Sequence, residues 1–391
     1  MIFSGLEILI ICKQSKLDSK DKLYFKAYID NAFNHCTSSQ QVIGSLLTSS
    51  QFKLTNTEIA GLLKIKMDND VKLFRYSEAA QTGDKLLSQY SNTLDTADLA
   101  DIRNSNKIWH ALAQVPPQQN DITADTWLTW KRDIAGLMTI PVDANGQPSD
   151  FVFDTGANFS TISQSYAKKF NMQLIQTSFS LGSGTSIVNQ ATLAIADKLQ
   201  IGNITLTNVV FLVLPDEQLI FPSAHYEIHG IIGFPVIASL GEINVYKNGK
   251  INIPVMQMVY SLKNLALDGL IPVISMKTDR DTLSYRFDTG AKQTELFSNY
   301  FDKYRDEISK NSKADTIQRG SAGGIAKIKA YHLQDFSFNA GGKKITLHQT
   351  DVLAEPFANN KEYYYGNIGQ DFISQFNEMT INFKQMFINF N

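Results

Sequence analysis

Two carboxylate residues stand in the same local sequence at two places in the chain. Asp154 and Asp288 each lie within the pentapeptide F-D-T-G-A, 288 − 154 = 134 residues apart. One D-T-G match carries little weight, whereas two copies in matched surroundings are much less expected by chance. If folding brings the two side chains together, one carboxyl can accept a proton while the other donates one. The pair therefore predicts acid–base chemistry on a bound substrate.

The segments around the two motifs follow one plan. In each copy a β-prone run leads into the aspartate, and the next glycine but one, Gly156 or Gly290, is expected to form a tight turn at positive φ. Strand, turn and strand are predicted at 137–142, 145–146 and 150–153, and again at 271–277, 278–281 and 283–287. A helix-like segment follows each motif, at 164–170 and 299–308.

Further along, both copies contain a glycine-rich turn between predicted strands. These turns are Gly182, Ser183 and Gly184 in the first copy and Gly320, Ser321, Ala322, Gly323 and Gly324 in the second. Neither has the spacing of a phosphate-binding loop, so each predicts the mobile tip of a β-hairpin. Each copy then closes on an apolar–glycine step, Ile232-Gly233 or Ile368-Gly369. The shared order predicts duplication of a β-rich unit.

The region before these copies has helical rather than alternating spacing of apolar residues, from Ser19 to about Ala113. Breaks are predicted near 36–38, 48–51 and 91–93. Short helical hairpins of this kind bear a distant likeness to tetratricopeptide stacks, although no 34-residue period is visible. Two interpretations stay open, a groove that docks a partner and a domain that supports the catalytic region. Pro116 and Pro117 end the helical region, because tandem prolines cannot continue a helix.

Composition limits the classes of function. A chain of 391 residues with 43% apolar and 19% charged residues predicts two or three globular domains. A net charge of −2 argues against nucleic-acid binding. Both cysteines lie outside the duplicated region, and the six histidines lack ligand spacing, so we expect neither a metal nor another cofactor. No apolar run is long enough for a transmembrane helix.

The N-terminus allows two interpretations. The run Ile8–Ile11 before Cys12 resembles a lipoprotein signal, which would direct the protein to a bacterial cell envelope or periplasm. Glu7, the missing basic region and the bulky Ile11 depart from that pattern. The alternative is an irregular N-terminus on a cytoplasmic protein.

The order of F-D-T-G-A, glycine-rich hairpin and I-I-G or N-I-G resembles the retropepsin-like (retroviral-type) aspartic peptidases, in a bacterial single-chain form. The resemblance covers about 134–391. It implies two β-barrel lobes in a pseudo-two-fold acid protease fold, preceded by an all-α domain, hence a multidomain α+β protein. It further implies that Asp154 and Asp288 are the catalytic dyad, that Thr155 and Thr289 interlock beneath it, and that the glycine-rich turns are flap tips. Asn367 departs from the family, which has an apolar residue there.

We therefore expect a lipoprotein-signal-like or irregular N-terminus over 1–18, a helical domain over 19–115, a linker and lead-in strand over 116–133, and protease lobes over 134–262 and 263–391. The expected function is an aspartic endopeptidase acting on extended polypeptides, as a monomer. A protein partner on the helical domain belongs to the first of the two interpretations of that domain. The alternative is a non-catalytic peptide-binding scaffold with an acid protease fold. Self-processing or inhibition by the N-terminal region is a third hypothesis.

The residue after each motif glycine bears on the pH dependence. Ala157 and Ala291 cannot donate a hydrogen bond to an ionised carboxylate, as a serine or threonine there would. We therefore expect a weakly acidic pH optimum. Substrate is expected to bind as an extended strand between flap and dyad.

Overall fold

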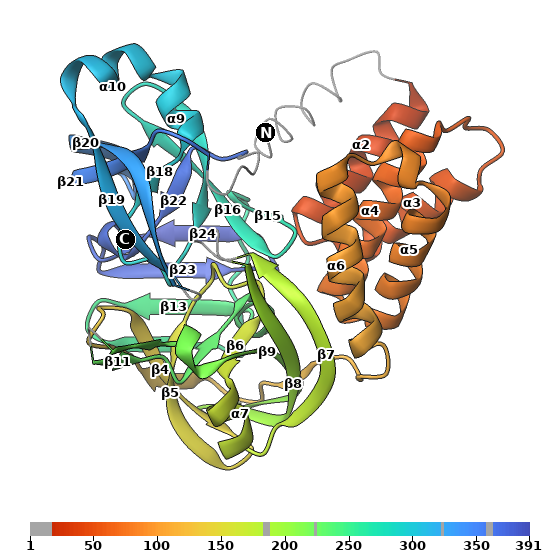
Figure 1. The fold of residues 1–391 in the computed structure, drawn as a ribbon, viewed down its shortest axis with the longest axis horizontal. Coiled ribbons are helices and arrows are strands. Elements are labelled where there is room, and N and C mark those ends of the chain that lie inside the picture. The colour runs from red at the N-terminus through yellow and green to blue at the C-terminus, as the bar shows by residue number, and fades with distance from the viewer. Residues whose placement is uncertain (1–17, 183–187, 223–224, 322–323, 357–362) are drawn as a thin grey trace.

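The computed structural model describes residues 18–182, 188–222, 225–321, 324–356 and 363–391. The predicted flap residues Ser183, Gly184, Ala322 and Gly323, and the N-terminal residues 1–17, lie outside this range. The described chain forms a helical region and two β-barrels, which we call lobe 1 and lobe 2 (Figure 1).

Between Asp18 and the tandem prolines, the described chain forms five α-helices: α2 (Ser19–Ala32), α3 (Cys36–Thr48), α4 (Asn56–Lys72), α5 (Tyr76–Gln89) and α6 (Thr96–Leu112). Side-chain caps fix the starts of α2, α4 and α6, since Asp18, Thr55 and Asp95 each accept a hydrogen bond from a first-turn amide. The break expected at 36–38 falls earlier, because α3 already begins at Cys36. Asn34, at a φ of 57°, makes the turn between α2 and α3.

The first two helical hairpins are built alike. Asn34 and Phe74 both have a φ of 57°, and the residue after each donates its backbone N–H over 2.7 Å to the carbonyl of an aspartate, Asp30 or Asp70. Each of these aspartates also pairs with the lysine four residues before it. The two turns are 74 − 34 = 40 residues apart, so a repeat exists, at a longer period than that of tetratricopeptides.

Lobe 1 is a closed ring of six strands, because β8 pairs with both β4 and β9. Its ring consists of β4 (Met138–Ala144), β5 (Gln147–Phe153), β12 (Gly230–Ile232), β6 (Ser160–Ser163), β9 (Ile204–Leu214) and β8 (Val188–Ile201). The predicted Asn145-Gly146 turn joins β4 and β5, with both residues at positive φ. Outside the ring lie β1 (Gln119–Asp121), β3 (Lys131–Arg132), β7 (Gln173–Gly182) and the pair β10 (Ile220–Phe221) and β11 (Tyr226–Glu227).

Lobe 2 repeats this ring, closed by the pairing of β16 with β20. Its ring consists of β16 (Ile271–Thr278), β17 (Thr282–Phe287), β22 (Gly366–Ile368), β18 (Glu295–Leu296), β21 (Lys343–Leu353) and β20 (Gly324–Ala340). β15 (Leu265–Asp268) and β19 (Ala314–Ser321) extend the sheet. The expected helix after the motif is α7 (Gln164–Lys169) in lobe 1, but it is divided in lobe 2 into α9 (Ser298–Lys303) and α10 (Arg305–Asn311). The predicted two-lobe protease fold with a helical N-terminal region is confirmed.

A third sheet joins the lobes. It has the order β2 (Thr126–Thr129), β14 (Lys250–Ile253), β13 (Glu242–Tyr246), β23 (Glu378–Asn382) and β24 (Phe387–Phe390). The strands β13 and β23, which follow the two barrels in sequence, pair with each other over five residues of each strand. Because its strands come from both lobes, this interlobe sheet fixes one barrel against the other.

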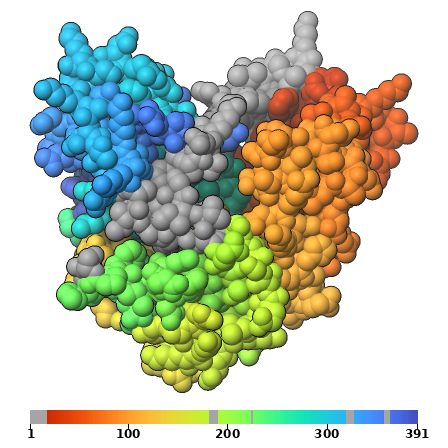
Figure 2. All heavy atoms as spheres, in the orientation of Figure 1, coloured from red at the N-terminus to blue at the C-terminus, as the bar shows by residue number. Residues whose placement is uncertain are grey.

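The helical region lies against the barrels, and its orange surface in Figure 2 meets the yellow-green surface of lobe 1 directly. Trp109 of α6 stacks on Tyr76 and contacts Phe159, three residues after Gly156. Asn34 donates a hydrogen bond to the carbonyl of Phe383 beside the interlobe sheet. Within the described ranges, no helix has the length and apolar character needed to cross a membrane.

Candidate active site

Two pairs of parallel strands deliver the two aspartates. Asp154 follows β5, which pairs with β12, and its backbone N–H donates to the carbonyl of Ile232 over 3.0 Å. Asp288 follows β17, which pairs with β22, and its N–H donates to the carbonyl of Ile368 over the same distance. The apolar–glycine steps thus hold the backbone at the point where each strand ends.

The two motif threonines tie the loops together. Each backbone N–H, of Thr155 and Thr289, donates to the hydroxyl of the other threonine over 3.0 Å. Each hydroxyl in turn donates to the carbonyl before the opposite aspartate, that of Phe287 at 2.9 Å and that of Phe153 at 2.8 Å. Both threonines are fully buried. Four reciprocal hydrogen bonds in a dry interior give the loops one fixed relative position.

The motif glycines lie against the opposite carboxyl groups. A Cβ on Gly156 would stand 2.5 Å from the Asp288 carboxyl carbon, and one on Gly290 would stand 2.2 Å from that of Asp154. Neither glycine has a φ in the left-handed region, so the expectation of a positive-φ turn was wrong. Glycine is required here because any side chain would displace the facing carboxyl.

Backbone amides hold one oxygen of each carboxyl. Asp154 Oδ1 accepts from the N–H groups of Gly156 at 2.8 Å and Ala157 at 3.1 Å, and Asp288 Oδ1 accepts from Gly290 at 2.9 Å. Burial, then the neighbouring negative charge of Asp288 and the hydrogen bond to it, raise the pKa of Asp154 well above its usual value. The two groups can therefore share one proton.

The second oxygen of Asp288 has a side-chain partner. Asn367 Nδ2 donates to Asp288 Oδ2 over 2.9 Å. Asn367 lies on β22 across from Arg286, two residues before Asp288, and Ile231 lies on β12 across from Val152, two residues before Asp154. The equivalent position in lobe 1 thus carries a side chain that cannot donate a hydrogen bond.

The supporting residues after each motif are arranged alike. The carbonyl of Ala157 accepts from the N–H of Phe234 at 2.8 Å, and that of Ala291 accepts from the N–H of Gln370 at 2.9 Å. The two donors, Phe234 and Gln370, are the first residues of two short helices, α8 (Phe234–Ser239) and α11 (Gln370–Ile373). The N–H groups of Gly233 and Gly369 each donate over 3.1 Å to a hydroxyl, that of Ser160 or Thr294.

The predicted flap residues within the described chain lie at hairpin ends. Gly182 ends β7 opposite Val188 of β8, and Ser321 ends β19 opposite Gly324 of β20, with Gly320 opposite Ile325. The side chain of Asn104 on α6 binds the backbone of Ser180 twice, donating to its carbonyl at 2.5 Å and accepting from its N–H at 2.9 Å. The helical region therefore holds the outer strand of the lobe 1 hairpin.

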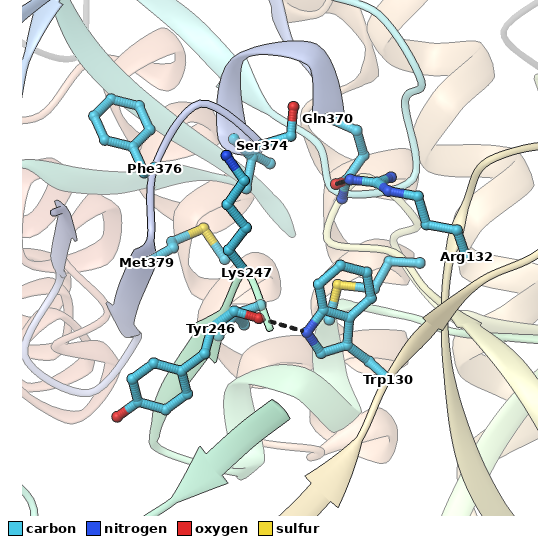
Figure 3. A pocket seen from close by; sticks show the side chains of 11 residues that line it. Trp130, Arg132, Tyr246, Lys247, Gln370, Ser374, Phe376 and Met379 are labelled. Carbon is cyan, nitrogen blue, oxygen red and sulfur yellow. Dashed lines mark hydrogen bonds between the residues drawn. The ribbon is translucent and has the colours of Figure 1, made fainter. Parts of the chain in front are cut away.

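A cavity of about 230 Å³ opens beside the motif loops but is not lined by either aspartate (Figure 3). Its wall includes Trp130, Arg132 and Gln370. Gln370 Nε2 donates to the carbonyl of Thr289 at 2.9 Å, and Arg132 donates to Gln370 Oε1 at 3.2 Å. These contacts support the lobe 2 motif from the side of lobe 1.

Sequence reasoning missed Asn104 and Gln370, and it noted Asn367 only as a departure from the family, without a contact to Asp288. Only Asn367 carried a signal, because it breaks the apolar pattern of the step before its glycine. In the part of the chain that the structure describes, no cluster of three or more His, Cys, Asp or Glu side chains could hold a metal ion.

Comparison with known proteins bears on the first lobe. Residues 140–236 match the family model described as aspartyl protease, a segment that runs from β4 through Asp154 to the start of α8. No curated protein sequence matches the chain. Residues 140–236 thus form an aspartyl protease family domain, and the chain has the two-barrel architecture of a retropepsin-like aspartyl protease behind a helical N-terminal region.

Proposed function

We propose that the protein is an aspartic endopeptidase in which Asp154 and Asp288 together activate a water molecule. One observation carries this proposal: each motif glycine lies against the opposite carboxyl, while reciprocal threonine hydrogen bonds lock the two loops together. The family match over 140–236 independently supports a peptidase. The substrate would be a polypeptide in an extended conformation.

The chemistry needs one proton on the dyad. A water molecule between the carboxyls gives a proton to the ionised group while its oxygen bonds to the carbonyl carbon. The protonated group gives its proton to the carbonyl oxygen, which yields a neutral gem-diol. Collapse of the gem-diol breaks the C–N bond, as one carboxyl takes a hydroxyl proton and the other protonates the leaving nitrogen. The dyad then holds a single proton again.

The test is cleavage of a denatured protein mixture between pH 4 and 7 by wild type, Asp154→Asn and Asp288→Asn. Each single variant is expected to lose at least about 1,000-fold in kcat/KM, because each removes one of the two proton-transfer roles. Asp150→Asn is the matched control, since this exposed aspartate of β5 forms a surface ion pair with Lys131. Activity that survives in either dyad variant rejects the proposed dyad, whereas a wild type that cleaves nothing would favour a non-catalytic scaffold.

The pH profile gives a second test. Because the pKa of Asp154 is raised, the dyad keeps its proton to higher pH than an ordinary aspartate would. Activity should therefore peak in the weakly acidic range, and a peak below about pH 4 would contradict the proposed state of the dyad.

A further inference from the structure

Asn367 breaks the symmetry of the dyad. Its amide donates to Asp288 Oδ2, the oxygen left over after Gly290 has bound Oδ1. Asp154 receives both of its backbone hydrogen bonds on Oδ1, and the residue equivalent to Asn367 in its lobe is Ile231. Of the two carboxyls, only that of Asp288 accepts a side-chain amide of this kind among the described residues.

Burying this amide lowers the stability of the fold, which an aliphatic side chain at the same position would not do. Asn367 is 5% exposed, and its Oδ1 is buried without a hydrogen-bond partner. A buried polar atom without a partner destabilises the fold, whereas Ile231 fills the same place in lobe 1 with no such atom. Turning the amide over would direct Oδ1 at a carboxylate oxygen, where both atoms are acceptors. In its present orientation the amide donates to Asp288 Oδ2, and a donor stabilises the ionised carboxyl more strongly than the neutral one.

We propose that Asn367 assigns the two roles in the dyad, by holding Asp288 as the carboxylate that accepts a proton from water and thereby leaving the shared proton on Asp154. This inference rests on the proposed peptidase function and specifies it. Asn367 acts through Asp288 and is thus a positioning residue.

The charged residues on the elements next to Asp288 are unchanged in the Asn367, Ile231 and Asn244 variants used below. They come from the opposite motif, from β17, from β18 and from α11: Asp154, Arg286, Glu295 and Asp371. A difference between wild type and an Asn367 variant therefore reports the amide itself.

The test is a titration of the two carboxyl groups by carbon-13 NMR of protein labelled at the aspartate carboxyl carbon. Signals are assigned by their loss in Asp154→Asn and Asp288→Asn. In wild type we expect Asp288 to give a carboxylate signal at pH values where Asp154 still gives a carboxyl signal. In Asn367→Leu, which keeps the shape of the side chain, Asp288 should take up its proton about one pH unit higher. The acid limb of the kcat/KM profile should move to higher pH by the same amount.

Asn244→Leu is the matched control, because it removes a half-buried amide that accepts from Thr380 within the interlobe sheet. It should leave both carboxyl titrations unchanged, although it also removes a hydrogen bond. The double variant Asn367→Leu with Ile231→Asn moves the amide to lobe 1 and should reverse the assignment. If Asn367→Leu does not fold, Ile231→Asn alone still tests the inference. With an amide beside each aspartate, the two carboxyl groups should titrate at more similar pH values than in wild type.

The NMR result does not depend on peptidase activity, so a catalytically inactive protein would reject the proposed function and still test the assignment. A wild-type protein in which Asp154 ionises first would overturn the inference. So would an Asn367→Leu variant whose Asp288 titrates as in wild type.

Discussion

In lobe 1 the strand beside Asp154 carries Ile231, and in lobe 2 the strand beside Asp288 carries Asn367 at the same register. The helix that follows begins with Phe234 in lobe 1 and with Gln370 in lobe 2. The glutamine side chain donates a hydrogen bond to the carbonyl of Thr289 in its own motif, which a phenylalanine cannot do. The backbone hydrogen bonds to the two carboxyl groups differ by one, because Asp154 Oδ1 accepts from both Gly156 and Ala157 while Asp288 Oδ1 accepts from Gly290. The two lobes thus share the same arrangement of strands and helices around their aspartates, while unlike side chains give the two carboxyl groups different electrostatic surroundings.

The hairpins differ as well. The outer strand β7 of lobe 1 is bound by Asn104 from the helical region. Among the described residues, no side chain of that region makes a hydrogen bond to the corresponding strand of lobe 2, β19. If the helical region supports a hairpin, it therefore supports that of lobe 1.

The largest expected effect tests what the lobes share. Gly156→Ala and Gly290→Ala should each lower kcat/KM by about 100-fold or more, because the new Cβ displaces the opposite carboxyl from its reactive position. Gly146→Ala, in an open turn, is the control for strain at a glycine. Steady-state kinetics on one peptide substrate decides the matter, and a motif variant with wild-type activity would show that the carboxyls need not approach so closely.

The next effect concerns the shared threonines. Thr155→Val and Thr289→Val should each lower the free energy of unfolding by about 1–3 kcal/mol, because each leaves the N–H of the other threonine buried without an acceptor. The two losses should be similar in size. Urea unfolding measures both, and Thr129→Val at the exposed end of β2 provides a control. Strongly unequal losses of unfolding free energy would mean that the two lobes depend on the reciprocal threonine hydrogen bonds to different degrees.

A smaller effect should separate the two hairpins. Asn104→Ala should speed amide hydrogen exchange in β7 about tenfold, because the edge strand loses both side-chain hydrogen bonds, while exchange in β19 stays unchanged. Ser105→Ala on the same helix is the control, since its hydroxyl bonds within α6. Equal acceleration of both hairpins would point to a general loosening of the protein rather than a local contact.

The smallest effect addresses the two alanines. Ala157→Ser should lower the pKa of Asp154 by donating to its ionised form, and the basic limb of the activity profile should move down by about half a pH unit. Ala291→Ser should change the profile less, because Asp288 Oδ2 already accepts from Asn367. Profiles of kcat/KM from pH 3 to 8 test this. A larger shift from Ala291→Ser would reverse the proposed asymmetry.

Much of the fold could be predicted because its signals are local. The Asn145-Gly146 turn, the strands around each motif and the helical spacing before Ala113 depend on neighbours in the chain. Prediction failed where distant atoms decide. The glycine of each motif was assigned to backbone conformation, whereas the opposite carboxyl explains it. The 40-residue repeat of the helical hairpins was missed because it preserves a turn and an ion pair more than a continuous pattern.

The sequence by itself determined that the chain contains two copies of one unit and that each copy brings one aspartate to the end of a strand. Short-range propensity and the repeated motif suffice for that. Only the tertiary structure decided that the two copies face each other, through the paired strands β13 and β23 and the reciprocal threonines. It also decided that Asn367 contacts Asp288 while Asn104 holds β7. Such contacts join residues tens to hundreds of positions apart, and their geometry depends on the packing of whole barrels.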